Sequence, residues 1–209
     1  MQTERSTLRP VTIADAAALA ELVAQLYSAE EPSLLRGPRA GQLRLFRHLI
    51  EHELSATTRG RFLAVDAGGA PLGSASLRLY GDPYPGNLPP GLVLTAARHV
   101  GLANTLRFYG YLLRGSLATE TPLRRGECYL YSVIVSEGAR RRGVGYTMIE
   151  QLEAYARHAG MRAALLRVMD DNADARRLYA RLGYSTRTRS SPLAAWLGVP
   201  SELMRKDLG

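Results

Sequence analysis

The chain has 209 residues, which suffices for one domain with a full hydrophobic core or for one domain that carries an insertion. Hydrophobic residues make up 46% of it and charged residues 22%, as in an ordinary soluble protein. The formal net charge of +8 comes almost wholly from arginine, because Lys206 is the only lysine. This charge predicts a polyanionic partner.

Several classes of protein are excluded or disfavoured by the same composition. Cys128 is the only cysteine, so disulfide frameworks and cysteine metal clusters are excluded. Of the four histidines, His48 and His52 are four apart on an expected helix, but no His-Glu-x-x-His pattern accompanies them, and we expect no metal. The first residues lack an apolar signal core, and no apolar run approaches membrane-spanning length. No basic helix with interleaved aromatic residues indicates a nucleic-acid surface. We therefore expect a cytoplasmic protein without nucleic-acid or membrane partners.

The first 80 residues alternate between strand and helix patterns. Thr12 and Asp15 resemble a capping box that opens a helix, and residues 67–71 resemble a hairpin turn between two strands. The expected elements in this part are strands over 6–10, 61–66 and 72–80, and helices over 12–26 and 43–54.

Residues 81–126 interrupt this pattern and predict a partly helical insertion. The stretch 82–90 is rich in proline and glycine, which excludes regular structure there. Residues 91–117 predict one or two helices with apolar side chains roughly on one face, among them Leu102, Leu106 and Leu113. The insertion could line a substrate site, form a dimer contact, or cap the core.

The stretch from Val133 to Thr147 carries the strongest motif. A buried strand over 127–135 leads into a polar loop, and a helix over 144–158 follows, with an apolar stripe that includes Tyr155. Gly143 and Gly145 let a ligand approach the backbone closely, and the start of a helix offers free N–H groups to an anion. The pattern indicates a phosphate site, although a solvated arginine-rich turn would have the same composition.

A second motif follows a strand over 162–169. Asp170, Asp171 and Asn172 are each suitable to cap the next helix, and Gly183 ends it. Tyr179 lies on the apolar stripe of that helix, where a tyrosine is more often a core residue than a catalyst. Strands are expected over 185–189 and 202–208.

Together the two motifs resemble the GCN5-related N-acetyltransferase (GNAT) superfamily. Arg140-x-x-Gly143-x-Gly145 is similar to its pyrophosphate loop, and Asn172 to Tyr184 is similar to its following helix. The resemblance is specific over 127–184 and absent over 81–126. It implies one N-acetyltransferase domain over residues 1–209. The implied fold is of the α/β (α+β) class, a mixed sheet of about six or seven strands with helices on both faces and parted central parallel strands.

The resemblance also implies an acyl-CoA-dependent N-acyltransferase, most simply one that moves acetyl from acetyl-CoA to a primary amine by direct attack in a ternary complex. Tyr179 would be the general acid near the thioester sulfur, and Asn172 would help to hold the pantetheine arm. The residues implied to bind acetyl-CoA are Val133, Ile134, Val135, Arg140, Arg141, Arg142, Gly143, Val144, Gly145, Tyr146, Asn172 and Tyr179.

For the general base this sequence departs from the family, because relatives place Glu or His where Tyr129 or Tyr131 stands. By period two, Glu127, Tyr129, Tyr131, Val133 and Val135 are expected to share one face. Glu127 is then the nearest carboxylate and the candidate base, directly or through water, while an exposed strand-end charge is the alternative. Tyr129 and Tyr131 would contact the acceptor.

Relatives that acetylate peptide α-amines carry Glu where Arg167 stands, which disfavours N-terminal acetylation of ribosomal proteins. The part of the insertion between Pro83 and Thr119 has no acidic residue, which disfavours polycationic acceptors and favours an amine with an anionic or neutral body. A homodimer is possible. The alternative function is a non-catalytic acyl-CoA-binding or regulatory module.

Overall fold

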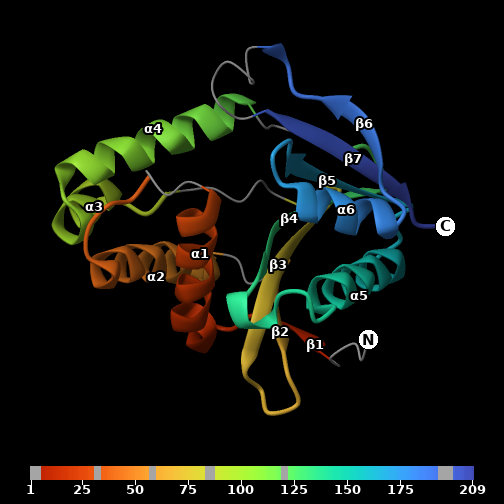
Figure 1. Cartoon of the computed structure of the whole chain (residues 1–209), viewed down its shortest axis with the longest axis horizontal. Helices are drawn as coiled ribbons and strands as arrows, with labels where there is room; N and C mark the ends of the chain where they lie inside the picture. The colour runs from red at the N-terminus through yellow and green to blue at the C-terminus, as the bar shows by residue number, and fades with distance from the viewer. Residues whose placement is uncertain (1–5, 31–33, 57–59, 83–87, 119–121, 193–199) are drawn as a thin grey trace.

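One seven-stranded sheet forms the centre of the computed structural model, which describes residues 6–30, 34–56, 60–82, 88–118, 122–192 and 200–209 (Figure 1). The strand order is β1-β2-β3-β4-β5-β7-β6. Only β4 and β5 run parallel, and every other neighbouring pair is antiparallel. The strands are β1 (Thr7–Pro10), β2 (Arg61–Val65), β3 (Pro71–Leu79), β4 (Glu127–Val135), β5 (Ala163–Met169), β6 (Ser185–Arg189) and β7 (Ser201–Asp207). The predicted mixed sheet is confirmed.

Helices cover both faces of this sheet, as predicted. A core on one face contains side chains from α5 and α6, and the core on the other face contains side chains from α1, α2, α3 and α4. Figure 1 shows the second group of helices on the opposite side of the molecule from α5 and α6. The helices are α1 (Ala16–Glu30), α2 (Arg39–Ala56), α3 (Leu92–Val100), α4 (Leu102–Ala118), α5 (Val144–His158) and α6 (Ala173–Arg181), with short 3₁₀ turns at η1 (Ile13–Asp15) and η2 (Glu137–Ala139).

The first helical segment begins at the predicted capping box. The Asp15 carboxylate accepts hydrogen bonds from the backbone N–H of Thr12 at 2.8 Å and from its hydroxyl at 2.9 Å. Arg9 of β1 donates to the same carboxylate at 2.8 and 2.6 Å. One side chain therefore ties β1 to the start of η1 and α1.

The insertion between β3 and β4 forms two helices that cap the core. Phe108 of α4 is 2% exposed, and its ring packs edge-on against Phe46 of α2, with the centroids 6.5 Å apart. α3 crosses α2 so closely that a Cβ on Gly41 would lie 2.0 Å from the carbonyl oxygen of His99. Of the predicted irregular stretch 82–90, residues 83–87 lie outside the described residues.

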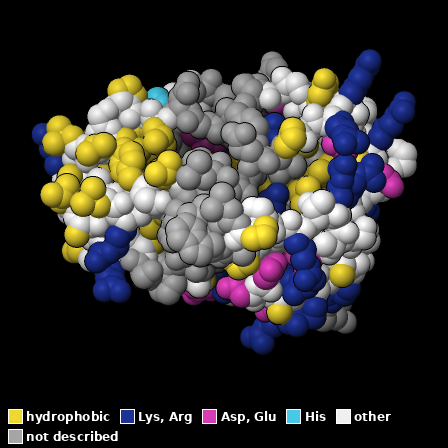
Figure 2. Space-filling model, turned by 90° about the horizontal axis from the view of Figure 1, so that it is seen from above, with side chains coloured by type: hydrophobic (Ala, Val, Ile, Leu, Met, Phe, Trp, Pro, Cys, Tyr) yellow, Lys and Arg dark blue, Asp and Glu magenta, His cyan; other side chains and the backbone are white. Residues whose placement is uncertain are grey.

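The single apolar face predicted for the insertion is wrong. Gly101, with φ 81°, ends α3 and starts α4 in a new direction, so a periodicity drawn across both helices does not hold. The structure leaves Leu102, Leu106 and Leu113 between 61 and 67% exposed. Figure 2 shows hydrophobic side chains gathered on this part of the surface, which includes the exposed Val93 and Leu94 of α3.

The predicted stripe of α5 is also wrong at Tyr155 and at Ala159, which is exposed just after the last residue of the helix. Tyr155 is 51% exposed, whereas Glu153 is 1% exposed and lies inside the protein. The Glu153 carboxylate accepts a hydrogen bond from the Lys206 ammonium of β7 at 2.6 Å. This partner compensates the buried negative charge, which the helical periodicity alone would place in water.

In the described part of the chain, no helix has the length and hydrophobicity needed to cross a membrane.

Candidate active site

β4 and β5 separate halfway along their length. They pair only from Glu127 with Ala163 to Leu130 with Leu166, although β4 continues to Val135 and β5 to Met169. Beyond these pairs β4 bonds only to β3, and β5 only to β7. The last five residues of β4 therefore present an unpaired backbone edge to a gap between two parallel strands, and such an edge can bond to an extended ligand.

A bulge at Ser132 changes which side chains of β4 point to each face of the sheet. The register slips between Ser74 and Ser76 of β3, and Ser132 takes a positive φ of 48°. Before the bulge, Leu130 packs in the core beside α5, and after it Val133 packs against that same core. The expectation that Glu127 to Val135 share one face by period two is therefore wrong. Glu127, Tyr129 and Tyr131 keep the predicted face, while Val133 and Val135 turn to the other.

The loop after β4 presents backbone N–H groups at the end of the gap. Arg141 and Gly143 both take left-handed backbone conformations, with φ 61° and 85°, and α5 begins at Val144. Alternating conformations of this kind turn successive N–H groups toward one point, and the first N–H groups of a helix have no intrahelical acceptor. The loop therefore has backbone conformations that favour anion binding, and the anion site itself stays a prediction.

Side chains of the same loop brace its backbone. Arg140 donates through Nε to the carbonyl oxygen of Val135 at 3.4 Å, and Arg142 donates through Nη1 to that of Gly138 at 3.1 Å. A Cβ on Gly145 would lie 3.2 Å from the Leu178 side chain and 3.3 Å from that of Val135. The start of α5 therefore packs tightly between β4 and α6, and a larger residue at 145 would push it outward.

α6 carries the second motif along the other side of the gap. Asn172 is its N-cap, and its side-chain oxygen accepts a hydrogen bond from the backbone N–H of Ala175 at 3.1 Å. Tyr179 is 7% exposed and meets the ring of Tyr184 edge-on, with the centroids 5.9 Å apart. The ring of Tyr179 is thus fixed in the core, as the apolar stripe predicts.

Two tyrosines lie on the opposite face of β4. The rings of Tyr129 and Tyr131 stack with their centroids 6.2 Å apart. Burial raises the pKa of Tyr131 above its ordinary value, and the nearby carboxylate of Glu53 adds to this rise. Tyr131 is therefore protonated at neutral pH and can donate a hydrogen bond, but it cannot act as a base.

Glu127 lies at the end of β4 away from the loop, and it is surrounded by arginines. It accepts a hydrogen bond from the backbone N–H of Arg124 at 2.9 Å, and it pairs with Arg187 at 3.5 Å and with Arg205 at 3.8 Å. Sequence reasoning missed Arg187 and Arg205. They belong to β6 and β7, and only the order of strands brings them near β4.

The remaining candidates take no part in this arrangement. Cys128 is a fully buried strand thiol, as expected, and burial raises its pKa to about 12, so it is not a reactive thiolate at neutral pH. Across the described residues, no group of three or more His, Cys, Asp or Glu side chains could hold a metal ion.

The chain belongs to the GNAT family of acetyltransferases, whose family model matches residues 23–184. Solved structures share the fold. An acetyltransferase crystal structure aligns with a TM-score of 0.61 at 22% identity, over 98% of this chain and 100% of that one. YncA from Salmonella typhimurium, solved with acetyl-CoA, aligns with a TM-score of 0.54 at 14% identity, over 99% and 95%. The PaiA N-acetyltransferase from Thermoplasma acidophilum, solved with coenzyme A, aligns with a TM-score of 0.59 at 12% identity, over 97% and 99%. No curated protein matches the sequence significantly.

Proposed function

We propose that this protein is an acyl-CoA-dependent N-acyltransferase that transfers acetyl from acetyl-CoA to a primary amine of a small molecule or peptide. The observation that carries the proposal is the gap between β4 and β5, which opens beside the N–H groups of the 140–146 loop. YncA and PaiA, which share the fold, were solved with acetyl-CoA and coenzyme A. The amine would attack directly while both substrates are bound.

The donor's diphosphate would bind the loop, and its pantetheine arm would bond to the free edge of β4 at Val133 to Val135. Ser136 donates its N–H to Leu72 of β3 at 2.9 Å. Because successive N–H groups of a strand point to opposite edges, the Val135 N–H is directed toward the gap. It would stabilise the negative oxygen that forms when the amine attacks the thioester. Asn172 would hold the pantetheine arm with the part of its amide that capping leaves free.

Proton transfer would involve residues on both sides of the gap. Tyr179 would protonate the leaving thiolate, and Glu127 would accept the proton of the amine through water. Tyr129 and Tyr131, on the same face of β4 as Glu127, would contact the acceptor.

One observation favours a second candidate, a non-catalytic acyl-CoA-binding or regulatory module. The Glu127 carboxylate is already shared between two arginines and a backbone N–H, which leaves it poorly placed to act as a base. A module of this kind would bind the donor and lack transfer to any amine.

Titration calorimetry with acetyl-CoA and longer acyl-CoA thioesters, followed by a thiol-release assay over a wide set of amines, tests both candidates. An enzyme should bind the donor and release CoA in the presence of at least one amine. Binding without amine-dependent release would favour the module. The absence of binding heat with every thioester would refute both.

We further propose that the whole chain acts as one domain in the cytoplasm and needs neither metal nor nucleic acid. The homodimer stays a prediction. The hydrophobic side chains on α3 and α4 are where a second copy would find uncovered apolar surface.

A further inference from the structure

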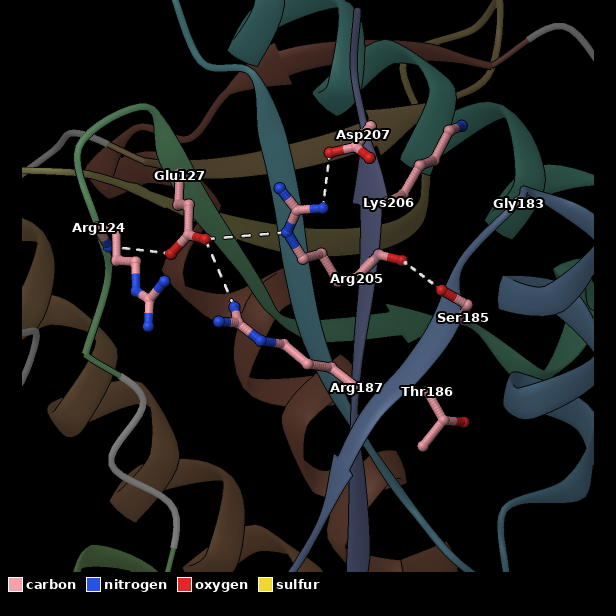
Figure 3. A pocket seen from close by; sticks show the side chains of 9 residues that line it. All are labelled: Arg124, Glu127, Gly183, Ser185, Thr186, Arg187, Arg205, Lys206 and Asp207. Carbon is pink, nitrogen blue, oxygen red and sulfur yellow. Dashed lines mark hydrogen bonds and ion pairs between the residues drawn. The ribbon is translucent and has the colours of Figure 1, made fainter.

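A hollow of about 770 Å³ lies beside Glu127, at the end of the sheet away from the loop. Its walls come from the segment before β4, from β6 and from β7. Figure 3 shows the side chains of Arg124, Arg187 and Arg205 gathered around the Glu127 carboxylate. Asp207 and Lys206 also line the hollow.

The positive charges of the hollow exceed the negative ones. Glu127 is held by Arg187 and Arg205, and Asp207 pairs with Arg205 at 2.6 Å. The Lys206 ammonium turns away to Glu153, so its charge is neutralised outside the hollow. Three arginines therefore face two carboxylates that are already satisfied, which leaves one excess positive charge and several free donors.

Arg124 and Arg187 hold most of these free donors. Arg124 is exposed and uses only its backbone N–H toward Glu127, and its guanidinium forms no ion pair within the described part of the chain. Among the side chains that the structure describes, Arg187 pairs only with Glu127, at 3.5 Å through Nη1, and its own side chain is 34% exposed. A guanidinium with open donors binds carboxylate and phosphate oxygens in a forked manner.

The hollow lies on the same face of the sheet as the two tyrosines of β4. Tyr129 pairs with Leu165 of β5, and Leu165 pairs with Arg205 of β7, so these residues form one row across three strands. Arg78 of β3 continues the row on the other side of Tyr129. Neighbouring strands lie about 4.8 Å apart, so the backbone of Arg205 is about 10 Å from that of Tyr129. A short molecule can therefore reach from the hollow to the tyrosines.

We infer that the acceptor is a primary amine that carries an oxyanion, a carboxylate or a phosphate, bound in this hollow by Arg124 and Arg187. The amine end then lies over Tyr129 and Tyr131, beside the gap that would hold the acyl donor. The part of the inference that names the bound molecule as the acyl acceptor rests on the proposed transferase function. The recognition of the anion belongs to the hollow itself and can be measured without catalysis.

The test compares amines of equal length by calorimetry, with and without coenzyme A. These are 6-aminohexanoate, 6-aminohexyl phosphate, hexylamine and 1,6-diaminohexane. We expect at least one of the two anionic amines to bind about ten-fold more tightly than hexylamine, and the diamine to bind weakest. Whichever anion binds more tightly identifies the group that the hollow recognises. Because exposed charges are screened by salt, the preference should shrink as ionic strength rises.

Two variants locate the effect. The double substitution Arg124→Gln with Arg187→Gln should reduce the preference for the anionic amine to less than about two-fold. Arg98→Gln, which removes an exposed arginine of α3 outside the hollow, should leave the preference intact. Equal binding of the anionic and neutral amines, a preference for the diamine, or a preference that survives the double substitution would overturn the inference. Anion preference in a protein that transfers no acetyl group would instead count against the proposed function alone.

Discussion

Tyr179 has two roles: its ring packs in the core, and its hydroxyl is the proposed proton donor. Its ring is 7% exposed and contacts Tyr184, so the ring belongs to the core. The proposed chemistry needs only the hydroxyl, because the leaving thiolate must receive a proton. Replacement by phenylalanine separates the two roles, since it keeps the ring and removes the acid.

For Tyr179→Phe we predict that kcat falls by about 10²–10⁴-fold, the usual contribution of a general acid. The affinity for acetyl-CoA, measured by calorimetry, should change little because the ring remains in place. Tyr155→Phe removes the hydroxyl of an exposed tyrosine on α5 and should leave kcat unchanged. A kcat for Tyr179→Phe within two-fold of the original would assign the proton to another group.

The junction between β1 and α1 depends on one carboxylate. Hydrogen bonds from Arg9, together with those from Thr12, hold the pKa of Asp15 well below its usual range. A carboxyl whose pKa is lower in the folded state stabilises the protein above the unfolded pKa of about 3.9, and this stabilisation declines as pH falls below it.

At pH 7, Asp15→Asn should lower the free energy of unfolding by about 0.5–1 kcal/mol, a modest figure because Arg9 is 40% exposed and screened by water. Urea unfolding at pH 7 and pH 3 measures it, and the difference between the variant and the original should shrink at pH 3. Asp174→Asn, which removes a largely exposed carboxylate at the start of α6, is the matched control. The idea fails if the Asp15 difference is equal at both pH values.

Elements with strong local signals were predictable from the sequence. The capping box at Thr12, the cap at Asn172 and the loop glycine Gly143 define boundaries through their own chemistry, and the observed helices begin there. The bulge at Ser132 has no such signal, because no glycine or proline marks it and the alternation appears unbroken in the sequence. The direction of α4 after Gly101 depends on its packing against α2, and the hydrophobic periodicity of the sequence carries no information about that packing.

The arginines around Glu127 show the same limit at longer range. Arg187 and Arg205 lie 60 or more positions further along the chain than Glu127, and strand order alone brings them together. The residues of β4 and of the loop after it could be predicted to lie together, because they are close to one another in the sequence. The surroundings of the candidate base could not, because they are assembled from three separate segments.

At the scale of the whole molecule, a buried ion pair joins α5 to the last strand. Glu153 has a side chain only 2% exposed, and Lys206 lies 2.6 Å away with 20% exposure. Arg157 approaches the same carboxylate at 3.4 Å from a more exposed position. Removal of the lysine would leave the buried carboxylate with Arg157 as its remaining cationic partner among the described residues.

Lys206→Met should therefore lower the free energy of unfolding by about 3 kcal/mol, as measured by urea denaturation. The double substitution Glu153→Leu with Lys206→Met removes both charges and should recover most of that loss. An unchanged urea midpoint for Lys206→Met would show that Arg157 or water compensates the carboxylate.

The pairing between β4 and β5 is short, and it joins the two halves of the sheet. Four residue pairs form the seam between the half made of β1 to β4 and the half made of β5 to β7. A molecule bonded along the free edge of β4 would fill the gap and hold the two halves of the sheet together. Because a ligand that binds only the folded state stabilises it by RT ln(1 + [L]/Kd), the melting temperature of the protein would rise with the concentration of free ligand. The concentration of the ligand would then influence the stability of the folded protein through the four residue pairs that join β4 to β5.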